Sequence, residues 1–128
     1  MVRRDLGCLS SPGGDFLDAC EAQGLWLFAE TPSPPDDFIN LWKSHPALVA
    51  WNIADDFNAP YSGTPNHPVA EVVARRDLTQ SLAPAHLTYA SGGSYPGYRI
   101  AEYAGAADVL AFQAYHREPD EPVRRRVG

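Results

Sequence analysis

The sequence has few cysteines, no long apolar run and no basic stripe interleaved with aromatic residues. Its two cysteines, Cys8 and Cys20, do not have the spacing of a metal site and do not require a disulfide bond. No apolar stretch approaches the roughly 20 residues that a membrane-spanning helix needs. The first residues also lack the apolar core of a signal peptide. We therefore expect a soluble chain with no membrane partner, in a compartment that the sequence does not identify.

Nucleic acid and nucleotides are disfavoured as ligands. Sixteen acidic and ten basic residues give a formal net charge of -6. The basic cluster at residues 124–126 lies close to the C-terminus, where a solvated tail explains it. The loops contain neither G-x-G-x-x-G nor G-K-[ST], the motifs that place glycine amides around phosphates. We predict no nucleic-acid partner and no cofactor.

The 128 residues, 45% of them apolar, suit one domain with a buried core. Helical patterns are expected at about residues 15–23, 35–44, 68–82 and 98–107. They alternate with apolar runs, typical of buried strands, at 25–29, 48–53, 87–90 and 108–115. Residues 2–9 could form a fifth strand. This alternation predicts βαβ units and a parallel sheet over residues 1–116, followed by an irregular tail at 117–128.

Polar and aromatic groups collect where the predicted strands end. These residues are Glu30, Asn52, Asp55, Asp56, Ser91, Gln113, Tyr115 and His116. Long loops rich in proline and glycine follow the strands, whereas the joins from helix to strand are short. Because the carboxyl ends of parallel strands share one edge, this asymmetry predicts a functional site there, as in (β/α)₈ barrels and open α/β sheets.

Several of these residues also have a purely structural interpretation. The pair Asp55-Asp56 suits a turn or a helix cap, and Glu30 suits a helix or loop cap. Tyr115 and His116 fit the packed end of a strand. Trp51, inside a predicted strand, fits the core.

Three stretches, in this order, resemble the catalytic (β/α)₈ barrels of retaining glycoside hydrolases of the β-galactosidase/β-glucuronidase type. Residues 45–53 read HPALVAWNI and are followed by Asp55-Asp56, similar to the family's strand four, W-N/S-x-x-N-E after His-Pro. Residues 16–25 read FLDACEAQGL, similar to F-L-D-x-C-D-x-x-G-L before strand three, which ends in an acidic residue as Glu30 does here. Residues 108–115 read DVLAFQAY, similar to strand six. The likeness covers residues 2–115.

The resemblance implies a partial TIM (β/α)₈ barrel of about four to five parallel strands, roughly strands two to six. It implies a fragment of an enzyme that cleaves O-glycosidic bonds, with a carbohydrate substrate. Asp56 takes the position of the general acid/base, although its side chain is one methylene shorter than the family's glutamate. The implied sugar-binding residues are Asn52, Asp55, Glu30, Gln113 and Tyr115. Asp55 replaces an asparagine that would contact the sugar 2-hydroxyl. Candidate surfaces for stacking against the sugar are Trp51, Tyr61 and Tyr95.

Two other functions stay open. A retaining mechanism needs a second carboxyl group about 5–5.5 Å from the first, and the family's nucleophile belongs to strand seven, beyond this chain; Glu118 and Glu121 are weak substitutes. The chain could therefore be a non-catalytic remnant or carbohydrate-binding relative. A metal-dependent hydrolase using Asp55, Asp56 and His67 or His116 has no ligand spacing in its favour.

The open edges of a partial barrel predict self-association.

Overall fold

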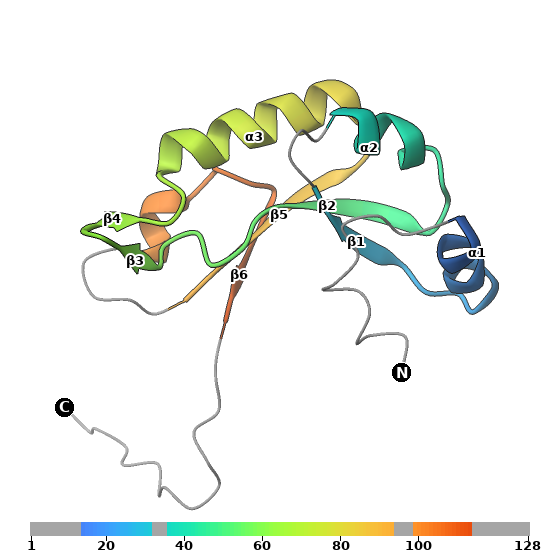
Figure 1. Cartoon of the computed structure of the whole chain (residues 1–128), viewed down its shortest axis with the longest axis horizontal. Helices are drawn as coiled ribbons and strands as arrows, with labels where there is room; N and C mark the ends of the chain where they lie inside the picture. Colours follow the sequence, from blue (N-terminus) through green and yellow to red (C-terminus); the bar gives the residue numbers. More distant parts are fainter. Residues whose placement is uncertain (1–13, 32–35, 94–98, 114–128) are drawn as a thin grey trace, which may run out of the picture.

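The computed structural model describes residues 14–31, 36–93 and 99–113, and they form an α/β fold. Its parallel four-stranded sheet has the order β1-β2-β5-β6. The strands are β1 (Leu27–Glu30), β2 (Leu48–Ala54), β5 (Leu87–Gly92) and β6 (Val109–Phe112). The helices α1 (Gly14–Ala22), α2 (Asp36–Trp42) and α3 (Val69–Leu82) alternate with them (Figure 1). The predicted class, a segment of a TIM barrel with a parallel sheet, is confirmed, and the expected N-terminal strand lies outside the described residues.

Two predictions of local structure were wrong. The expected loop after β2 contains a hairpin, β3 (Pro60–Tyr61) and β4 (Thr64–Pro65). Ser62 and Gly63 both have positive φ, 50° and 81°, which suits a two-residue hairpin turn. The helix expected at 98–107 is a single 3-10 turn, η3 (Ile100–Tyr103). Gly105, at φ 79°, reverses the chain soon after that turn.

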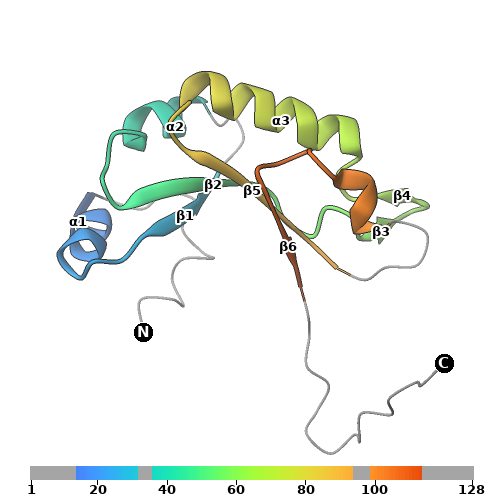
Figure 2. The ribbon, with the colours of Figure 1, turned by 180° about the vertical axis from the view of Figure 1, so that it is seen from behind.

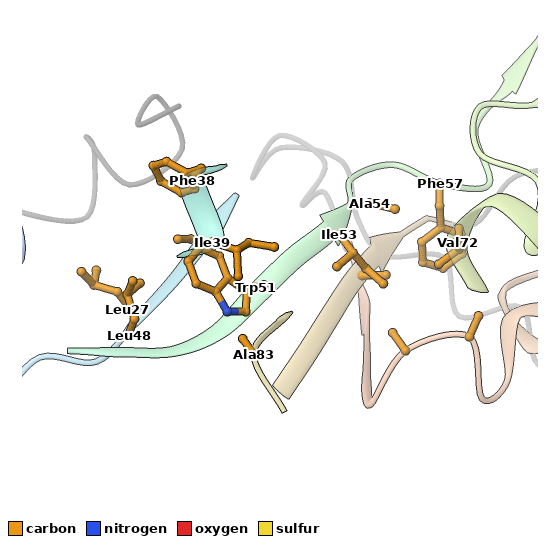
Figure 3. Close-up of a cluster of buried hydrophobic side chains, with 14 of the residues drawn as sticks. Leu27, Phe38, Ile39, Leu48, Trp51, Ile53, Ala54, Phe57, Val72 and Ala83 are labelled. Carbon is orange, nitrogen blue, oxygen red and sulfur yellow. The ribbon is translucent and has the colours of Figure 1, made fainter. Parts of the chain in front are cut away.

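The core lies between the sheet and its helices. Figures 1 and 2 show α2 and α3 along the same face of the sheet. Trp51 is fully buried there, its ring edge-on to Phe38, and its Nε1–H donates to His86 Nδ1 at 2.8 Å. Figure 3 shows Trp51 among apolar side chains of α2 and β2, including Ile39. The core interpretation of Trp51 therefore holds, and the sugar-stacking alternative for it was wrong.

Along each strand, core-facing side chains alternate with side chains that point to the opposite face of the sheet. Register pairs Phe28 with Ala50 and then with Leu87, and pairs Tyr89 with Val109. Phe28, Leu87 and Val109 are exposed in the described part of the chain. Residues that pair across neighbouring strands point to the same face of the sheet. We call the face that carries these exposed side chains the inner face. In a closed barrel such a face would line the interior.

Candidate functional site

The sheet register brings the predicted strand-end residues together. Glu30 lies opposite Asn52 on the neighbouring strand, and Asn52 lies opposite Tyr89 on the next. All three therefore belong to the inner face, near the carboxyl edge of the sheet. Gln113 directly follows β6, and its backbone N–H donates to the carbonyl of Gly92 at 2.7 Å. Side chains from all four strands thus converge on one edge, as the strand-end pattern predicted.

A shift in register places Asp55 on the inner face with Asn52. Residues three apart in a regular strand point to opposite faces. The pairing between β2 and β5 shifts between Asn52 and Ala54. Such irregularities re-aim the side chain that follows them. Ile53 and Ala54 both stay in the core, and Asp55 emerges beside Ser91 of β5.

Asp55 is the centre of a polar network that joins three strands. Its Oδ1 accepts hydrogen bonds from the Ser91 hydroxyl and from Gln113 Nε2, the latter at 2.7 Å. Gln113 Nε2 also lies 2.9 Å from Ser91 Oγ. Hydrogen bonds to a carboxylate are stronger than neutral ones. The network therefore fixes one oxygen of Asp55 against the ends of β5 and β6.

Negative charge accumulates around this network. Burial raises the pKa of Glu30 above its ordinary 4.5, and the charge of Asp55 raises it further. Burial and then the same charge also raise the pKa of Tyr89. The Tyr89 ring packs against Phe28 with centroids 5.5 Å apart. Sequence reasoning missed Tyr89 as a site residue, and its place opposite Asn52 emerges only from the register.

Asn52 supplies an acceptor to the same face. Its Oδ1 is buried and has no hydrogen-bond partner in the part of the chain that the structure describes. A buried polar atom without a partner is unfavourable by about 1–3 kcal/mol. It therefore suits a ligand that brings a hydroxyl or amine donor, or the protonated carboxyl of a neighbour.

Asp56 lies beside this network in an unusual backbone conformation. Its φ is 50°, in the left-handed region that non-glycine residues seldom adopt, although aspartate tolerates it. Its carbonyl accepts the N–H of Ala59 at 3.0 Å, and the residue is partly exposed. The hairpin β3–β4 and η3 lie side by side beyond this turn (Figure 1). Tyr103 of η3 ties the end of the loop by donating its hydroxyl to the carbonyl of His67 at 2.9 Å.

Several sequence predictions fall outside what the structure describes. Tyr115, His116, Tyr95, Glu118 and Glu121 lie outside the described residues, and of Tyr61 only the backbone is described. Their proposed contacts with a sugar or a metal stay predictions.

The described residues do not assemble the metal site that the sequence left open. His67 Nδ1 lies 2.9 Å from Glu71 Oε1, which also accepts a hydrogen bond from Arg75. Among the described side chains, Asp55, Asp56 and His67 do not gather at ligand distance. The one described group that does, Asp18, Glu21 and His45, lies elsewhere. There His45 Nδ1 accepts the N–H of Ala47, which directs the Nε2 proton toward Asp18.

Comparisons with known proteins give the fold of this segment. The sequence matches no protein-family model and no curated protein. The structure is similar to Bacteroides uniformis beta-glucuronidase 3, with a TM-score of 0.66 and 17% identity over 81% of this chain. It is also similar to a Parabacteroides merdae beta-glucuronidase, with a TM-score of 0.63 and 16% identity over 78% of the chain. The chain spans only 15% and 14% of those two proteins.

A further neighbour is a glycosyl hydrolase family 2 member from Bacteroides cellulosilyticus, with a TM-score of 0.54 and 17% identity over 79% of this chain. The chain spans 15% of that protein. All three neighbours are glycoside hydrolases by name. The described residues therefore have the fold of a glycoside hydrolase segment.

Proposed function

We propose that this chain forms part of the catalytic barrel of a family 2 type glycoside hydrolase that cleaves O-glycosidic bonds. The observation that carries the proposal is the Asp55–Ser91–Gln113 network at the carboxyl edge of a parallel sheet. Barrel enzymes place their active sites at that edge. The similarity of fold to beta-glucuronidases and the resemblance of residues 45–56 to strand four support the same assignment.

Within this proposal Asp56 is the general acid/base. Its support is its position: Asp56 directly follows Asp55 in the chain and has the left-handed backbone conformation, with φ 50°. A proton donor must come within roughly 2.6–3.2 Å of the glycosidic oxygen. An aspartate reaches less far than a glutamate, so the backbone turn at residue 56 has to supply the missing reach.

The sugar is held by acceptors and donors on the inner face. Asn52 Oδ1 and the carboxyl groups of Glu30 and Asp55 accept from sugar hydroxyls. Gln113 contributes its carbonyl oxygen as a further acceptor, because both N–H bonds of its Nε2 go to Asp55 and Ser91. Tyr115 belongs to the same set by the resemblance. The nucleophile would come from a strand beyond these 128 residues, so we expect this segment alone to be inactive.

A carbohydrate-binding protein without catalysis is the second candidate. The aspartate at the acid/base position favours it, because shortening the side chain by one methylene withdraws the proton from the scissile bond. The unpartnered Oδ1 of Asn52 favours binding in either case. The two candidates differ in whether the carboxyl group of Asp56 transfers a proton.

Sugar binding can be tested on the chain itself. We expect methyl β-glycosides at millimolar concentration to shift the backbone NMR signals of Glu30, Asn52 and Ser91. Asp55→Ala should remove that response, while Asp18→Ala, a change at an exposed carboxylate outside this network, should keep it. Absence of any response on the inner face, across a panel of neutral, acidic and amino sugars, would overturn the proposed sugar site.

Catalysis is tested on the longer polypeptide, if the reading frame continues beyond residues 1 and 128. Hydrolysis of a chromogenic β-glycoside that falls by about 100-fold or more in Asp56→Asn would support general acid/base catalysis, whose contribution is typically 10²–10⁴-fold. Unchanged hydrolysis in Asp56→Asn would exclude Asp56 as the acid/base, whereas sugar binding with no hydrolysis in either protein would leave the binding function.

A further inference from the structure

The side chain of Asn58 fastens the loop after β2 to the end of β5. Asn58 is fully buried, and its carboxamide pairs with the backbone of Gly93 in both directions. Its Nδ2 donates to the carbonyl of Gly93 at 2.6 Å, and its Oδ1 accepts the N–H of Gly93 at 2.8 Å. Buried backbone groups need such partners. Asn58 therefore does for Gly93 what a neighbouring strand would do.

Gly92 lets the loop approach this closely. A Cβ atom at residue 92 would lie 2.6 Å from Asn58 Oδ1 and 2.7 Å from Phe57 Cζ. Glycine permits the close contact because it has no side chain. The N–H of Phe57 donates to the carbonyl of Ser91 at 3.0 Å. Residues 57 and 58 are thus held by three successive residues at the end of β5.

Asp56 is the residue next to this fastened pair. Its φ of 50° is less favourable for a residue that has a Cβ atom than for glycine. A conformation of this kind persists only where its surroundings hold it. On one side of Asp56 the loop is held by Asn58, and on the other Asp55 is held by Ser91 and Gln113.

We propose that Asn58 is a positioning residue for Asp56. Its paired hydrogen bonds to Gly93 keep the Asp56 backbone left-handed, and so fix the point from which the Asp56 carboxyl group projects beyond the sheet. The catalytic meaning of this position rests on the proposed function. The conformational statement does not, because it concerns only the loop and the end of β5.

The backbone of Asp56 is measurable by NMR in the chain itself. A positive φ brings the amide proton of a residue close to its own Hα, which gives a strong intraresidue NOE. We expect this NOE in the wild type and its weakening in Asn58→Ala and Gly92→Ala, which release the loop from opposite sides. The Phe57 amide should also exchange with solvent at least about tenfold faster, since its hydrogen bond to Ser91 opens more often.

Thr88→Val is the matched control for loss of stability. Thr88 is also buried on β5, and it pairs with Asp108 through its hydroxyl and backbone at the opposite end of the strand. Removal of the Thr88 hydroxyl group should lower the unfolding temperature without changing the Asp56 NOE. An Asp56 NOE that stays strong in both loop variants, or that weakens equally in Thr88→Val, would overturn the proposal.

Asn58→Asp allows the contact to be switched within one protein and keeps the test usable if Asn58→Ala does not fold. A protonated carboxyl group can donate to and accept from Gly93 as the amide does, whereas a carboxylate can only accept. The Asp56 NOE of Asn58→Asp should match the wild type at low pH and weaken as the new carboxyl group ionises. The same NOE in wild type should be constant over that range, and an unvarying NOE in the variant would contradict the proposal.

Failure of the proposed function is distinguishable from failure of the positioning role. If the longer polypeptide hydrolyses glycosides, Asn58→Asp at neutral pH should lower kcat by on the order of 100-fold with little change in KM, as expected for a displaced catalytic group. A KM effect alone would overturn the positioning role. If neither binding nor hydrolysis is found, the glycosidase assignment fails, and the Asp56 NOE alone decides whether Asn58 positions the turn.

Discussion

Asp55 controls the electrostatics of the inner face. It accepts hydrogen bonds from Ser91 and Gln113, and its charge raises the pKa values of Glu30 and Tyr89. Burial acts in the same direction on both groups and is the larger cause. At the scale of single residues, the site is therefore a fixed carboxylate with a second carboxyl group nearby that holds its proton more tightly than usual.

Neutralising Asp55 should lower the pKa of Glu30. We expect Asp55→Asn to bring this pKa down toward 4.5 without reaching it, because burial still disfavours the charged form. The Glu30 carboxyl carbon, followed by NMR against pH, measures the change. Asp56→Asn removes a charge one residue away and serves as control, with little expected effect. A fall in Asp56→Asn but none in Asp55→Asn would show that the wrong aspartate was assigned.

Glu30 itself should reduce stability at neutral pH. Its folded-state pKa lies above the unfolded value, so folding is penalised once Glu30 ionises and the penalty disappears as the pH falls through the folded pKa. Glu30→Gln should therefore raise the unfolding temperature modestly at pH 7. Below about pH 4, where the glutamate is protonated in both states, the advantage should vanish. A benefit that is the same at both pH values would mean that charge is not its cause.

At the scale of elements, two side chain–backbone pairs fasten opposite ends of β5. Thr88 is bound to Asp108 ahead of β6, and Gly93 is bound to Asn58 of the loop after β2. The donors on Thr88 lower the pKa of Asp108. The first pair aligns the starts of β5 and β6, and the second holds the loop that carries Asp56.

His86, directly before β5, should make the stability of the fold sensitive to mild acid. Burial lowers the pKa of His86 from 6.5, and its Nδ1 accepts the N–H of Trp51 only while unprotonated. The unfolded chain takes up this proton more readily, so stability should fall as the pH drops from 7 to 5. Asp108 and Glu71, with pKa values lowered from 3.8 and 4.5, lose their contributions only at lower pH.

His86→Gln isolates this effect. The glutamine oxygen can accept from Trp51 Nε1 and does not titrate. We expect the variant to show a smaller drop in unfolding temperature between pH 7 and 5 than the wild type. Thermal unfolding followed by circular dichroism at the two pH values measures both drops. Equal drops in the two proteins would assign the pH dependence to other groups.

The order of the elements could be read from the sequence because each signal is local. Apolar runs predicted β2 and β5, and Gly24, at φ 65°, ends α1 as its position after the apolar pattern indicated. The sequence around Ser62-Gly63 predicts only a loop, since a hairpin of two-residue strands leaves almost no pattern. The length of η3 also depended on tertiary context.

The composition of the site was only partly predictable. Glu30, Asn52, Asp55 and Gln113 follow from the rule that parallel strands end at one edge, and the structure brings them to it. The side to which Asp55 points depends on a register shift between strands far apart in sequence. The role of Tyr89 depends on the same pairing. Local patterns contain no information on either.

At the scale of the whole molecule, the four parallel strands correspond to half of an eight-stranded barrel. In the part of the chain that the structure describes, β1 and β6 each pair on one side only. The inner face exposes Phe28, Leu87 and Val109, which a closed barrel would cover. Unpaired strand edges beside exposed apolar side chains favour association with another chain.

We therefore predict that the chain self-associates through its inner face. Sedimentation velocity between about 10 and 200 µM should show oligomers whose fraction rises with concentration. Leu87→Lys combined with Val109→Lys should weaken association by on the order of 100-fold, since burying one such side chain contributes about 1.5–3 kcal/mol and 1.4 kcal/mol is tenfold.

Leu41→Lys with Leu78→Lys removes a comparable apolar surface from α2 and α3, where both leucines are exposed. If the inner face drives association, this pair should leave the oligomers intact. A wild-type chain that stays monomeric throughout would contradict the prediction. Equal loss of oligomers in both double variants would point instead to general hydrophobic aggregation, because only a specific inner-face contact distinguishes Leu87 and Val109 on the sheet from the leucines on the helices.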